Sequence, residues 1–305
     1  MTPGSRSKAK AGPRRKGSLV IVGTGIRAVQ HTTTEAREEI SRADKLFYLV
    51  SDVVSEKWIR TLNPTAESLA SCYVRGGSRM SAYRRMVTKM LRSVRAGATV
   101  CAAFYGHPGV SVYPSHEAIR LAREEGFDAV MLPGISAEDC LLADLGIDPL
   151  RSGCQSFEAT DFLVFRRKFD TSSALLLWQA GVVGSTVYRP RGVRRGLREL
   201  AQYLAGFYGG RHELVLYEAS PLSMFRPMIR STTIEKLPAS GVDGSMTMFI
   251  PPKSRPPDPE ALRRLKLTRA SLKVVPPCWD PPPTEVRRTR STRRVRRRTV
   301  SSGTP

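Results

Sequence analysis

A guanidinium and two phenols lie close together in the segment from Cys72 to Tyr83. Arg79 and Tyr83 are four residues apart at the start of an expected helix, so their side chains share one face of it. The flexible turn Gly76–Gly77 can bring Tyr73 back to the same place. A guanidinium favours the phenolate of a nearby tyrosine, whose ordinary pKa is about 10, so such a group can act as a base. Packing is the alternative for Tyr83, because apolar side chains recur here at helical spacing: Met80, Tyr83, Val87, Met90 and Val94.

Two loops carry polar and aromatic groups where expected strands end. Tyr105–Gly109 follows a strand over Thr99–Phe104, and Pro133–Asp139 follows a strand over Ala129–Leu132. Ligands of open α/β sheets lie at the carboxyl ends of the strands, so two such loops side by side favour a ligand crevice. Helix capping is the alternative for Ser136, because an expected helix begins at the next residue.

The turn Val22–Ala28, directly after the first expected strand, has the G-x-G-x-x-A form of a dinucleotide-binding loop. Such a loop opens straight into a helix, whereas Gln30, His31 and three threonines follow here. A tight turn beneath an open sheet is therefore an equal alternative.

Short aliphatic runs alternate with helical stretches from Gly17 to Pro252, which is typical of an α/β fold with a largely parallel sheet. A break near residues 148–153 indicates two lobes, 17–150 and 151–252, the first of which contains the helix with Arg79. The expected strands are Ser18–Gly23, Lys45–Val50, Thr99–Phe104, Ala129–Leu132, Ala174–Gln179, Glu213–Glu218 and Ser245–Ile250. The expected helices are Thr34–Ala43, Arg79–Ala96, Ser115–Glu125, Ala137–Leu145 and Arg194–Leu204.

Most of the formal charge of +22, from 49 basic and 27 acidic residues, lies in two tails. Residues 1–16 hold six lysines or arginines, residues 287–298 hold eight arginines, and neither stretch contains an acidic residue. We expect disorder over 1–16 and 287–305, because these tails lack the apolar surface that offsets the entropy of ordering. A tail of this kind binds nucleic acid or an acidic partner, or is simply solvated.

Prolines concentrate in the last part of the chain, with 11 of the 22 in residues 251–305. Pro-Pro steps remove backbone donors and favour extended chain, so residues 253–286 are expected to form a strap, helical only over Pro259–Leu267.

Several classes of protein are excluded by composition. No apolar run approaches the roughly 18–20 residues that span a bilayer, and the basic N-terminus lacks the apolar core of a signal peptide. We therefore expect a cytoplasmic protein without membrane association. The five cysteines are odd in number and have no C-x-x-C spacing, which argues against a disulfide framework and a structural zinc site.

Six motifs, three of which overlap the turn or loops described above, can be compared with known families: Gly17–Ile26, Phe104–Val110, Met131–Cys140, Ala143–Pro149, Glu158–Phe162 and Phe249–Pro252. The loops among them resemble those of the tetrapyrrole methylase superfamily, whose members bind S-adenosylmethionine (SAM) between two α/β lobes. His107 stands where that family usually has an acidic residue, which disfavours a porphyrin-type substrate. Over residues 17–253 the chain more closely resembles the borosin peptide backbone α-N-methyltransferases of the omphalotin type.

This resemblance implies SAM-dependent α-N-methylation of backbone amides in a ribosomally made precursor peptide. In borosins the residues that match Tyr73, Arg79 and Tyr83 are catalytic. Methylation of a peptide nitrogen requires loss of the amide proton and leaves charge on the carbonyl oxygen. We therefore assign Tyr73 as the base, Arg79 as an electrostatic stabiliser and Tyr83 as a hydrogen-bond donor to the developing oxyanion.

The resemblance also implies a binding site for SAM and for its product S-adenosylhomocysteine, between the two lobes. No metal is expected, because the methyl group needs only to be held in line with the nitrogen. Alternatives exist for Gln179, which can cap a strand end, and for Tyr217, which can pack in the core. The implied cofactor residues are Tyr105, His107, Val110, Ser136, Ala137, Gln179, Tyr217, Gly244, Ser245 and Met246.

Substrate supply is expected to differ from that of fused borosins, whose chains end in an apolar core peptide. No stretch after Pro252 resembles such a core. We expect a separate precursor peptide, methylated in trans, and a homodimer in which the strap embraces the partner subunit. The active-site lining also differs, because Leu69, Ala70 and Ser71 stand where fused relatives carry further tyrosines.

Two other functions stay open on the sequence. A SAM-dependent RNA 2′-O-methyltransferase suits a basic chain, but the charge lies in tails without an aromatic and basic platform, so nucleic acid is not the expected partner. The other is a non-catalytic SAM- or peptide-binding scaffold, and the presence of Tyr73, Arg79 and Tyr83 argues against it.

Overall fold

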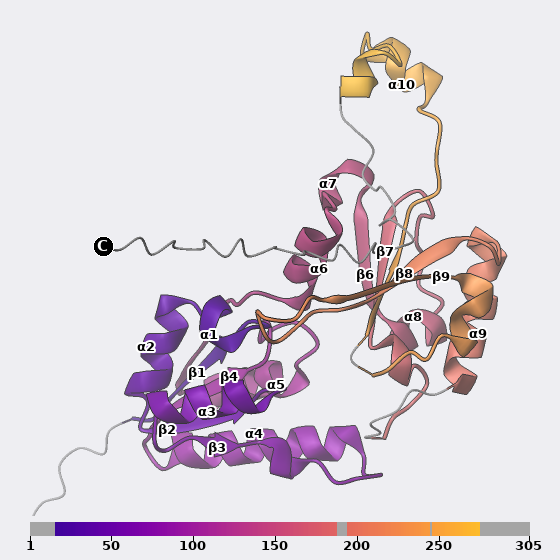
Figure 1. Cartoon of the computed structure of the whole chain (residues 1–305). Coiled ribbons are helices and arrows are strands. Elements are labelled where there is room, and N and C mark those ends of the chain that lie inside the picture. The colour runs from indigo at the N-terminus through magenta and orange to yellow at the C-terminus, as the bar shows by residue number, and fades with distance from the viewer. Residues whose placement is uncertain (1–15, 188–193, 245, 275–305) are drawn as a thin grey trace, which may run out of the picture.

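The computed structural model describes residues 16–187, 194–244 and 246–274, which form two lobes (Figure 1). Each lobe contains a five-stranded sheet, and in the first the order is β3-β2-β4-β1-β5 with every neighbouring pair parallel. Its strands are β1 (Ser18–Gly23), β2 (Lys45–Leu49), β3 (Glu67–Ser68), β4 (Thr99–Phe104) and β5 (Asp128–Met131). The four strands expected here are confirmed to within one residue at each end.

Helices cover both faces of this sheet: α1 (Ala28–His31), α2 (Thr34–Arg42), α3 (Val53–Leu62), α4 (Arg79–Arg95) and α5 (Tyr113–Glu124). Successive strand residues point to opposite faces, so an aliphatic parallel strand needs cover on both. On one face Ile40 of α2 belongs to the same buried cluster as Val20 of β1. On the other face Met90 of α4 packs in a cluster with Leu19. The short α1 begins at Ala28, directly after the turn that follows β1, so a helix does open there, although the sequence predicted none before Thr34.

The second sheet is mixed rather than largely parallel, so the predicted parallel pattern is wrong for this lobe. Its order is β6-β7-β10-β8-β9, and only β6 and β7 are parallel. Its strands are β6 (Cys154–Glu158), β7 (Ala174–Trp178), β8 (Glu213–Glu218), β9 (Met228–Thr233) and β10 (Thr247–Ile250). The sequence did not reveal β6 and β9, because these strands carry polar residues and none of their side chains is fully buried.

Four helices accompany the second sheet: α6 (Ala137–Leu145), α7 (Pro149–Ser152), α8 (Ala159–Val164) and α9 (Arg194–Tyr208). Phe162 of α8 and Leu200 of α9 pack in a cluster with Leu216 of β8. Leu141 of α6 packs in a different cluster, which includes Tyr217. The division of the chain at residues 150 and 151 stays a prediction, but α6 precedes it and packs on the second sheet.

Glycines allow the loops after β1, β4 and β5 to cross at contact distance. Gly25 and Gly106 form an antiparallel bridge, in which the Gly106 amide donates to the Gly25 carbonyl at 3.0 Å. A Cβ at Gly134 would lie 2.9 Å from the Gly23 Cα. Gly23 and Gly134 therefore have no room for a side chain, and the crossing brings the three loops to one edge of the sheet.

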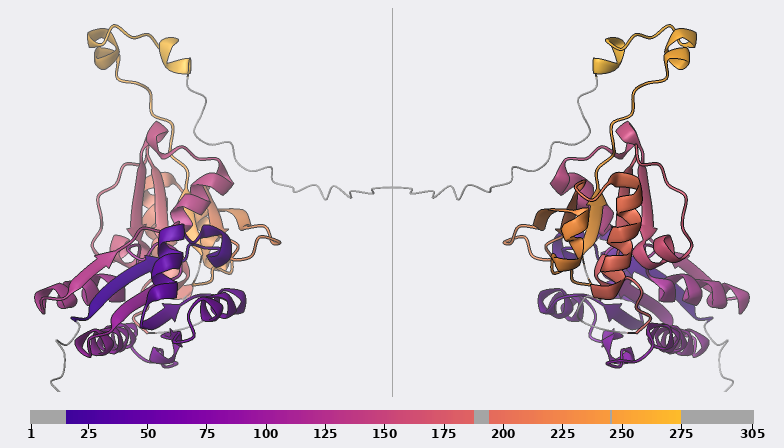
Figure 2. Two further views of the ribbon diagram at one scale, coloured as in Figure 1. Left: turned by 90° about the vertical axis from the view of Figure 1, so that its left-hand side faces the viewer. Right: turned by 90° about the vertical axis from the view of Figure 1, so that its right-hand side faces the viewer.

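An arm leaves the second lobe after β10 and projects from it (Figures 1 and 2). The Lys253 amide donates to the Thr171 carbonyl at 2.8 Å, and the arm then forms α10 (Pro259–Arg264) and the 3-10 turn η4 (Ser271–Val274). Residues 1–15 and 275–305, with the predicted tails and the rest of the predicted strap, lie outside the described residues. Among the described residues, no helix combines the length and apolarity needed to cross a membrane.

Gly23→Ala tests the loop crossing. The added Cβ would lie 2.3 Å from the Gly106 carbonyl oxygen and 2.8 Å from Pro108 Cδ, so backbone must move. We expect a loss of about 1–3 kcal/mol in the free energy of unfolding, measured by denaturant titration. The control is Gly206→Ala in α9, where an added Cβ meets nothing within 4 Å and a gain of up to about 1 kcal/mol is expected. Equal stability of the two variants would contradict this account.

Candidate active site

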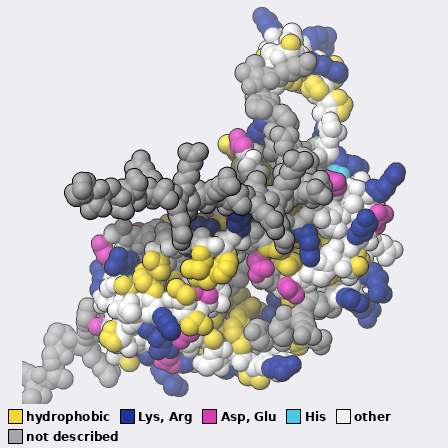
Figure 3. All heavy atoms as spheres, in the orientation of Figure 1, with side chains coloured by type: hydrophobic (Ala, Val, Ile, Leu, Met, Phe, Trp, Pro, Cys, Tyr) yellow, Lys and Arg dark blue, Asp and Glu magenta, His cyan; other side chains and the backbone are white. Residues whose placement is uncertain are grey.

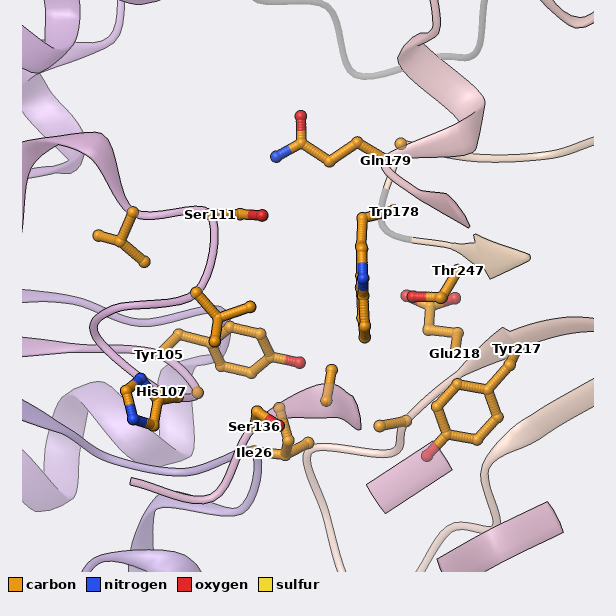
Figure 4. A pocket seen from close by; sticks show the side chains of 16 residues that line it. Ile26, Tyr105, His107, Ser111, Ser136, Trp178, Gln179, Tyr217, Glu218 and Thr247 are labelled. Atoms are coloured by element: carbon orange, nitrogen blue, oxygen red, sulfur yellow. The ribbon is translucent and has the colours of Figure 1, made fainter. Parts of the chain in front are cut away.

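A cavity of about 290 Å³ lies between the lobes (Figure 4). The first lobe supplies loops that follow β1, β4 and β5, and the second supplies residues at the ends of β7 and β8 and before β10. On the face shown in Figure 3, apolar side chains gather around the hollow between the lobes. The predicted cofactor residues that line the cavity are Tyr105, His107, Val110, Ser136, Ala137, Gln179, Tyr217 and Gly244. We call it the cofactor cavity.

One predicted cofactor residue that the structure describes is not part of this lining. Met246 packs in the core of the second lobe and is 7% exposed. Its thioether accepts a hydrogen bond from the Asp243 amide, so the side chain turns inward just before β10 begins. Burial in the core removes more of this apolar side chain from water than a place at the cavity rim would, so burial stabilises it more. Ser245 lies outside the described residues.

Local hydrogen bonds fix the two predicted ligand loops. His107 Nδ1 accepts from the Gly109 amide at 2.9 Å, which holds the imidazole against its own loop. Ser136 accepts from the Asp139 amide at 3.1 Å and donates to the Asp139 carboxylate at 2.8 Å. This is a full capping box at the start of α6, so the capping alternative for Ser136 is confirmed.

The two tyrosines of the cofactor cavity keep their protons. Burial, together with a 2.7 Å hydrogen bond to Asp144 of α6, raises the pKa of Tyr217 well above its ordinary value. That bond commits the hydroxyl to α6 and leaves the ring to line the cavity. Burial also raises the pKa of Tyr105 to about 12. The Tyr105 hydroxyl points into the cavity as a neutral group (Figure 4).

Sequence reasoning missed part of this lining: Ile26, Ser111, Val112, Trp178, Glu218, Ala219 and Thr247. Trp178 and Glu218 end β7 and β8, directly beside the predicted Gln179 and Tyr217. Their positions at strand ends could therefore have identified them from the sequence as lining residues. No feature of the sequence identifies Ser111 in this way. Ser111 and Gln179 both have left-handed backbone, with φ of 57° and 55°, which is uncommon for residues with side chains and typical of functional sites.

Two further cavities adjoin the first and contain the predicted catalytic residues. One, of about 460 Å³, includes Arg79 and Tyr83, and the other, of about 290 Å³, includes Tyr73 and Tyr83. Residues that either one shares with the cofactor cavity are Tyr105, Ser111, Val112 and Gln179. Tyr73, Arg79 and Tyr83 therefore lie directly beside the cofactor cavity. We call the larger of the two the arginine cavity and the smaller the tyrosine cavity.

The second lobe holds Arg79, the first residue of α4. Its guanidinium donates from Nη1 to Gln179 Oε1 at 2.9 Å and from Nη2 to the Ser185 carbonyl at 2.7 Å. The Arg79 amide donates to the Thr186 carbonyl at 3.3 Å. These bonds join the start of α4 to the second lobe and place the positive charge at the boundary between two cavities.

The two tyrosines predicted to be catalytic lie in a row of rings. The Tyr73 and Tyr83 centroids are 6.3 Å apart at an interplanar angle of 81°, and Tyr83 stacks on Tyr113 at 6.1 Å. Tyr73 and Tyr83 are both half-buried and pack against the core cluster that contains Met90. Tyr83 therefore belongs to the apolar stripe of α4, as the packing alternative predicts, and it also lines both neighbouring cavities, where its catalytic role stays a prediction.

Glu158, which the sequence did not single out, lines the arginine cavity. Its Oε2 accepts from the Asp161 amide at 2.7 Å and caps α8. Its Oε1 is buried and has no hydrogen-bond partner among the described residues. Among those residues, no three His, Cys, Asp or Glu side chains converge as a metal site.

Comparison with solved structures and family models agrees with this architecture. The family model for Tetrapyrrole (Corrin/Porphyrin) Methylases matches residues 18–238. The fold is similar to that of a cobalt precorrin-4 methyltransferase, with a TM-score of 0.55, 15% identity and coverage of 80% of this chain and 98% of that one. It is also similar to uroporphyrin-III-C-methyltransferase from Thermus thermophilus, with a TM-score of 0.55, 16% identity and coverage of 77% and 94%. The predicted tetrapyrrole-methylase-like α/β fold is confirmed.

Curated relatives are much more similar in sequence, and their names combine a methyltransferase with a ribosomally synthesised peptide precursor. The gymnopeptides precursor of Gymnopus fusipes is 42% identical, over 84% of this chain and 63% of that protein. The omphalotin A precursor of Omphalotus olearius is 41% identical, again over 84% and 63%. A type I borosin precursor of Coprinopsis marcescibilis is 39% identical, over 90% and 72%. The chain spans less than two thirds of the length of the first two.

The chain belongs to the tetrapyrrole methylase family and, within it, to the borosin methyltransferases. The resemblance inferred from the motifs is therefore confirmed.

Glu158→Gln tests the unpartnered carboxylate oxygen. An amide keeps an oxygen for the Asp161 cap and carries no charge, so burying its second polar atom costs less. We expect the free energy of unfolding to rise by about 1 kcal/mol, measured by denaturant titration. The control is Asp52→Asn, which caps α3 with both carboxylate oxygens already accepting from Ser55. A gain there as large as at Glu158, or a loss at Glu158, would contradict the assignment.

Proposed function

We propose that the protein is a SAM-dependent methyltransferase that α-N-methylates backbone amides of a ribosomally made precursor peptide. The observation that carries this proposal is the junction of the cavities. Gln179, Ser111 and Val112 line both the cofactor cavity and the arginine cavity. A methyl donor on one side of these residues can face a peptide on the other, close to Tyr73, Arg79 and Tyr83.

The chemistry of the cofactor cavity fits SAM. The rings of Tyr105 and Trp178 and the carboxylate of Glu218 line it, and such groups suit a cofactor that carries a sulfonium and an ammonium. Val110, Ala137 and Ala219 add apolar surface of the kind that accommodates an adenosine. SAM, when bound, supplies an electrophilic methyl group. The residues proposed to hold it are the eight predicted ones in this lining, with Ser245 and Met246 kept as predictions from the family.

The chain's own residues are proposed to handle the proton and the charge on the substrate. Tyr73 takes the amide proton, because a peptide nitrogen becomes nucleophilic only as its proton leaves. Arg79 places a positive charge beside the developing imidate oxygen, and Tyr83 donates a hydrogen bond to it. The edge-on contact of the Tyr73 and Tyr83 rings holds the two hydroxyl-bearing groups in the same cavity.

The peptide is proposed to come from a separate chain, and the protein to act as a cytoplasmic homodimer. The names of the relatives combine the methyltransferase and the peptide precursor in one protein, so supply in trans is a proposal kept from the sequence analysis. The arm that carries α10 stands away from its own lobe, which supports contact with a partner subunit (Figure 2). We expect light scattering to give the mass of two chains for the intact protein and the mass of one chain for a variant without the arm.

Mass spectrometry of the protein purified from its own host, with fragmentation of every peptide released, tests the function. We expect a companion peptide with 14-dalton increments on backbone nitrogens. Mass increments on this chain itself would show that the protein methylates its own polypeptide, which would contradict a substrate supplied in trans. Co-purified RNA with methylated ribose and no methylated peptide would favour the RNA 2′-O-methyltransferase. No methylated product of either kind would favour the scaffold.

Tyr73→Phe tests the base. The change removes one hydroxyl and keeps the ring packing, so we expect methylation of the companion peptide to fall by about 100-fold or more while S-adenosylhomocysteine still binds. The control is Tyr203→Phe on α9, whose ring stacks under Arg166 and lines none of the three cavities. Methylation by Tyr73→Phe at the unaltered rate would remove the assignment.

A further inference from the structure

The contact between Arg79 and Gln179 crosses from one lobe to the other and from one cavity to the next. Arg79 lines the arginine cavity and not the cofactor cavity, whereas Gln179 lines both. A hydrogen bond of 2.9 Å from Arg79 Nη1 to Gln179 Oε1 joins the two side chains. A residue assigned to the substrate side therefore touches a residue assigned to the cofactor side.

The donor-only chemistry of arginine fixes the orientation of the Gln179 amide. A guanidinium has five N–H donors and no acceptor, so the atom that faces it must be the amide oxygen. The Gln179 amide nitrogen then points away from Arg79, and Figure 4 shows the side chain extending over the cofactor cavity from the end of β7. The nitrogen end of the Gln179 amide is thereby left with N–H groups to offer to an acceptor atom of a ligand.

Arg79 is itself held independently of any ligand. Its second nitrogen bonds the Ser185 carbonyl, its amide bonds the Thr186 carbonyl, and the preceding Ser78 forms a β-bridge with Val187. The Gln179 backbone is equally constrained by its left-handed φ of 55°. Loss of Arg79 would leave the Gln179 side chain free to rotate and its amide free to present either end.

We propose that Arg79 is also a positioning residue for the cofactor, which it orients through Gln179 by selecting the donor end of the amide for an acceptor atom of SAM. This inference rests on the proposed cofactor. Binding free energies are reciprocal, so a bound cofactor in turn stabilises Arg79 in the position that serves the peptide. By the same reciprocity, a bound peptide that contacts Arg79 strengthens cofactor binding by the factor by which the cofactor strengthens peptide binding.

Calorimetric titration of the full chain with S-adenosylhomocysteine tests the proposal without a peptide. We expect Arg79→Ala and Gln179→Ala each to weaken binding about tenfold, as expected for one well-formed hydrogen bond. Because Arg79 acts through Gln179, the double variant should bind no more weakly than Gln179→Ala alone. A purely catalytic Arg79 would not change this affinity. The control is Arg84→Ala, an exposed arginine of the same helix that lines none of the three cavities.

Gln179→Glu separates orientation from folding. A carboxylate keeps an acceptor for Arg79 and retains the link between the lobes, but it offers no donor to the cofactor. We expect an unchanged or higher Tm together with a loss of affinity at least as large as in Gln179→Ala. If Arg79→Ala does not fold, the affinity of Gln179→Glu for S-adenosylhomocysteine still tests whether the donor end of the Gln179 amide binds the cofactor.

Several outcomes would overturn the proposal. Arg79→Ala that binds S-adenosylhomocysteine as tightly as the unaltered chain, additive losses in the double variant, or full affinity in Gln179→Glu would each do so while leaving the proposed function intact. Failure of the unaltered chain to bind S-adenosylhomocysteine would instead remove the proposed cofactor, and with it this inference.

Discussion

The active-site region depends on a steric constraint at the edge of the first sheet, where three chain segments must cross without side chains. Parallel strands deliver their carboxyl ends to the same edge, and the loops after β1, β4 and β5 all turn there. A Cβ at Gly23 would lie 2.3 Å from the Gly106 carbonyl oxygen, and a Cβ at Gly134 would lie 2.9 Å from the Gly23 Cα, both below a normal contact. The crossing brings Tyr105, His107 and Ser136 toward one cavity, and a bulkier residue at Gly23 or Gly134 would separate these loops.

Polar bonds and apolar packing together join the second lobe to the first. Arg79 bonds Gln179 and Ser185, and Arg27 donates to the Ser220 carbonyl at 3.4 Å. Ile26 of the first lobe belongs to the same buried cluster as Tyr217 of the second. Both arginines belong to the first lobe, and the two carbonyls that accept from them follow strands of the second, so each bond replaces a carbonyl's contact with water by a charged donor.

Much of the first lobe and of the site could be predicted from the sequence, because both depend on local signals. Four of the five described strands of the first sheet are largely apolar runs, and the loops that follow β1, β4 and β5 contain glycine, proline or capping residues. The two-residue β3 (Glu67–Ser68) is polar and was not predicted. The second sheet was predicted less well, because β6 and β9 lack an apolar run and strand direction depends on contacts far apart in the chain. Met246 could not be placed from its motif, since packing within the second lobe turned its side chain away from the cavity. Ser111 and Glu158 were missed for another reason: a left-handed backbone and an unpartnered buried oxygen are properties of the folded chain alone.

Ser111 and Val112 form a wall that all three cavities share. A change in this loop after β4 therefore alters the lining of the proposed donor site and of the proposed acceptor sites together. The far side of the tyrosine cavity is formed instead by Leu49, Val50 and Tyr73, which do not line the cofactor cavity. Substitutions on that far side can therefore reshape the tyrosine cavity while the lining of the cofactor cavity stays the same.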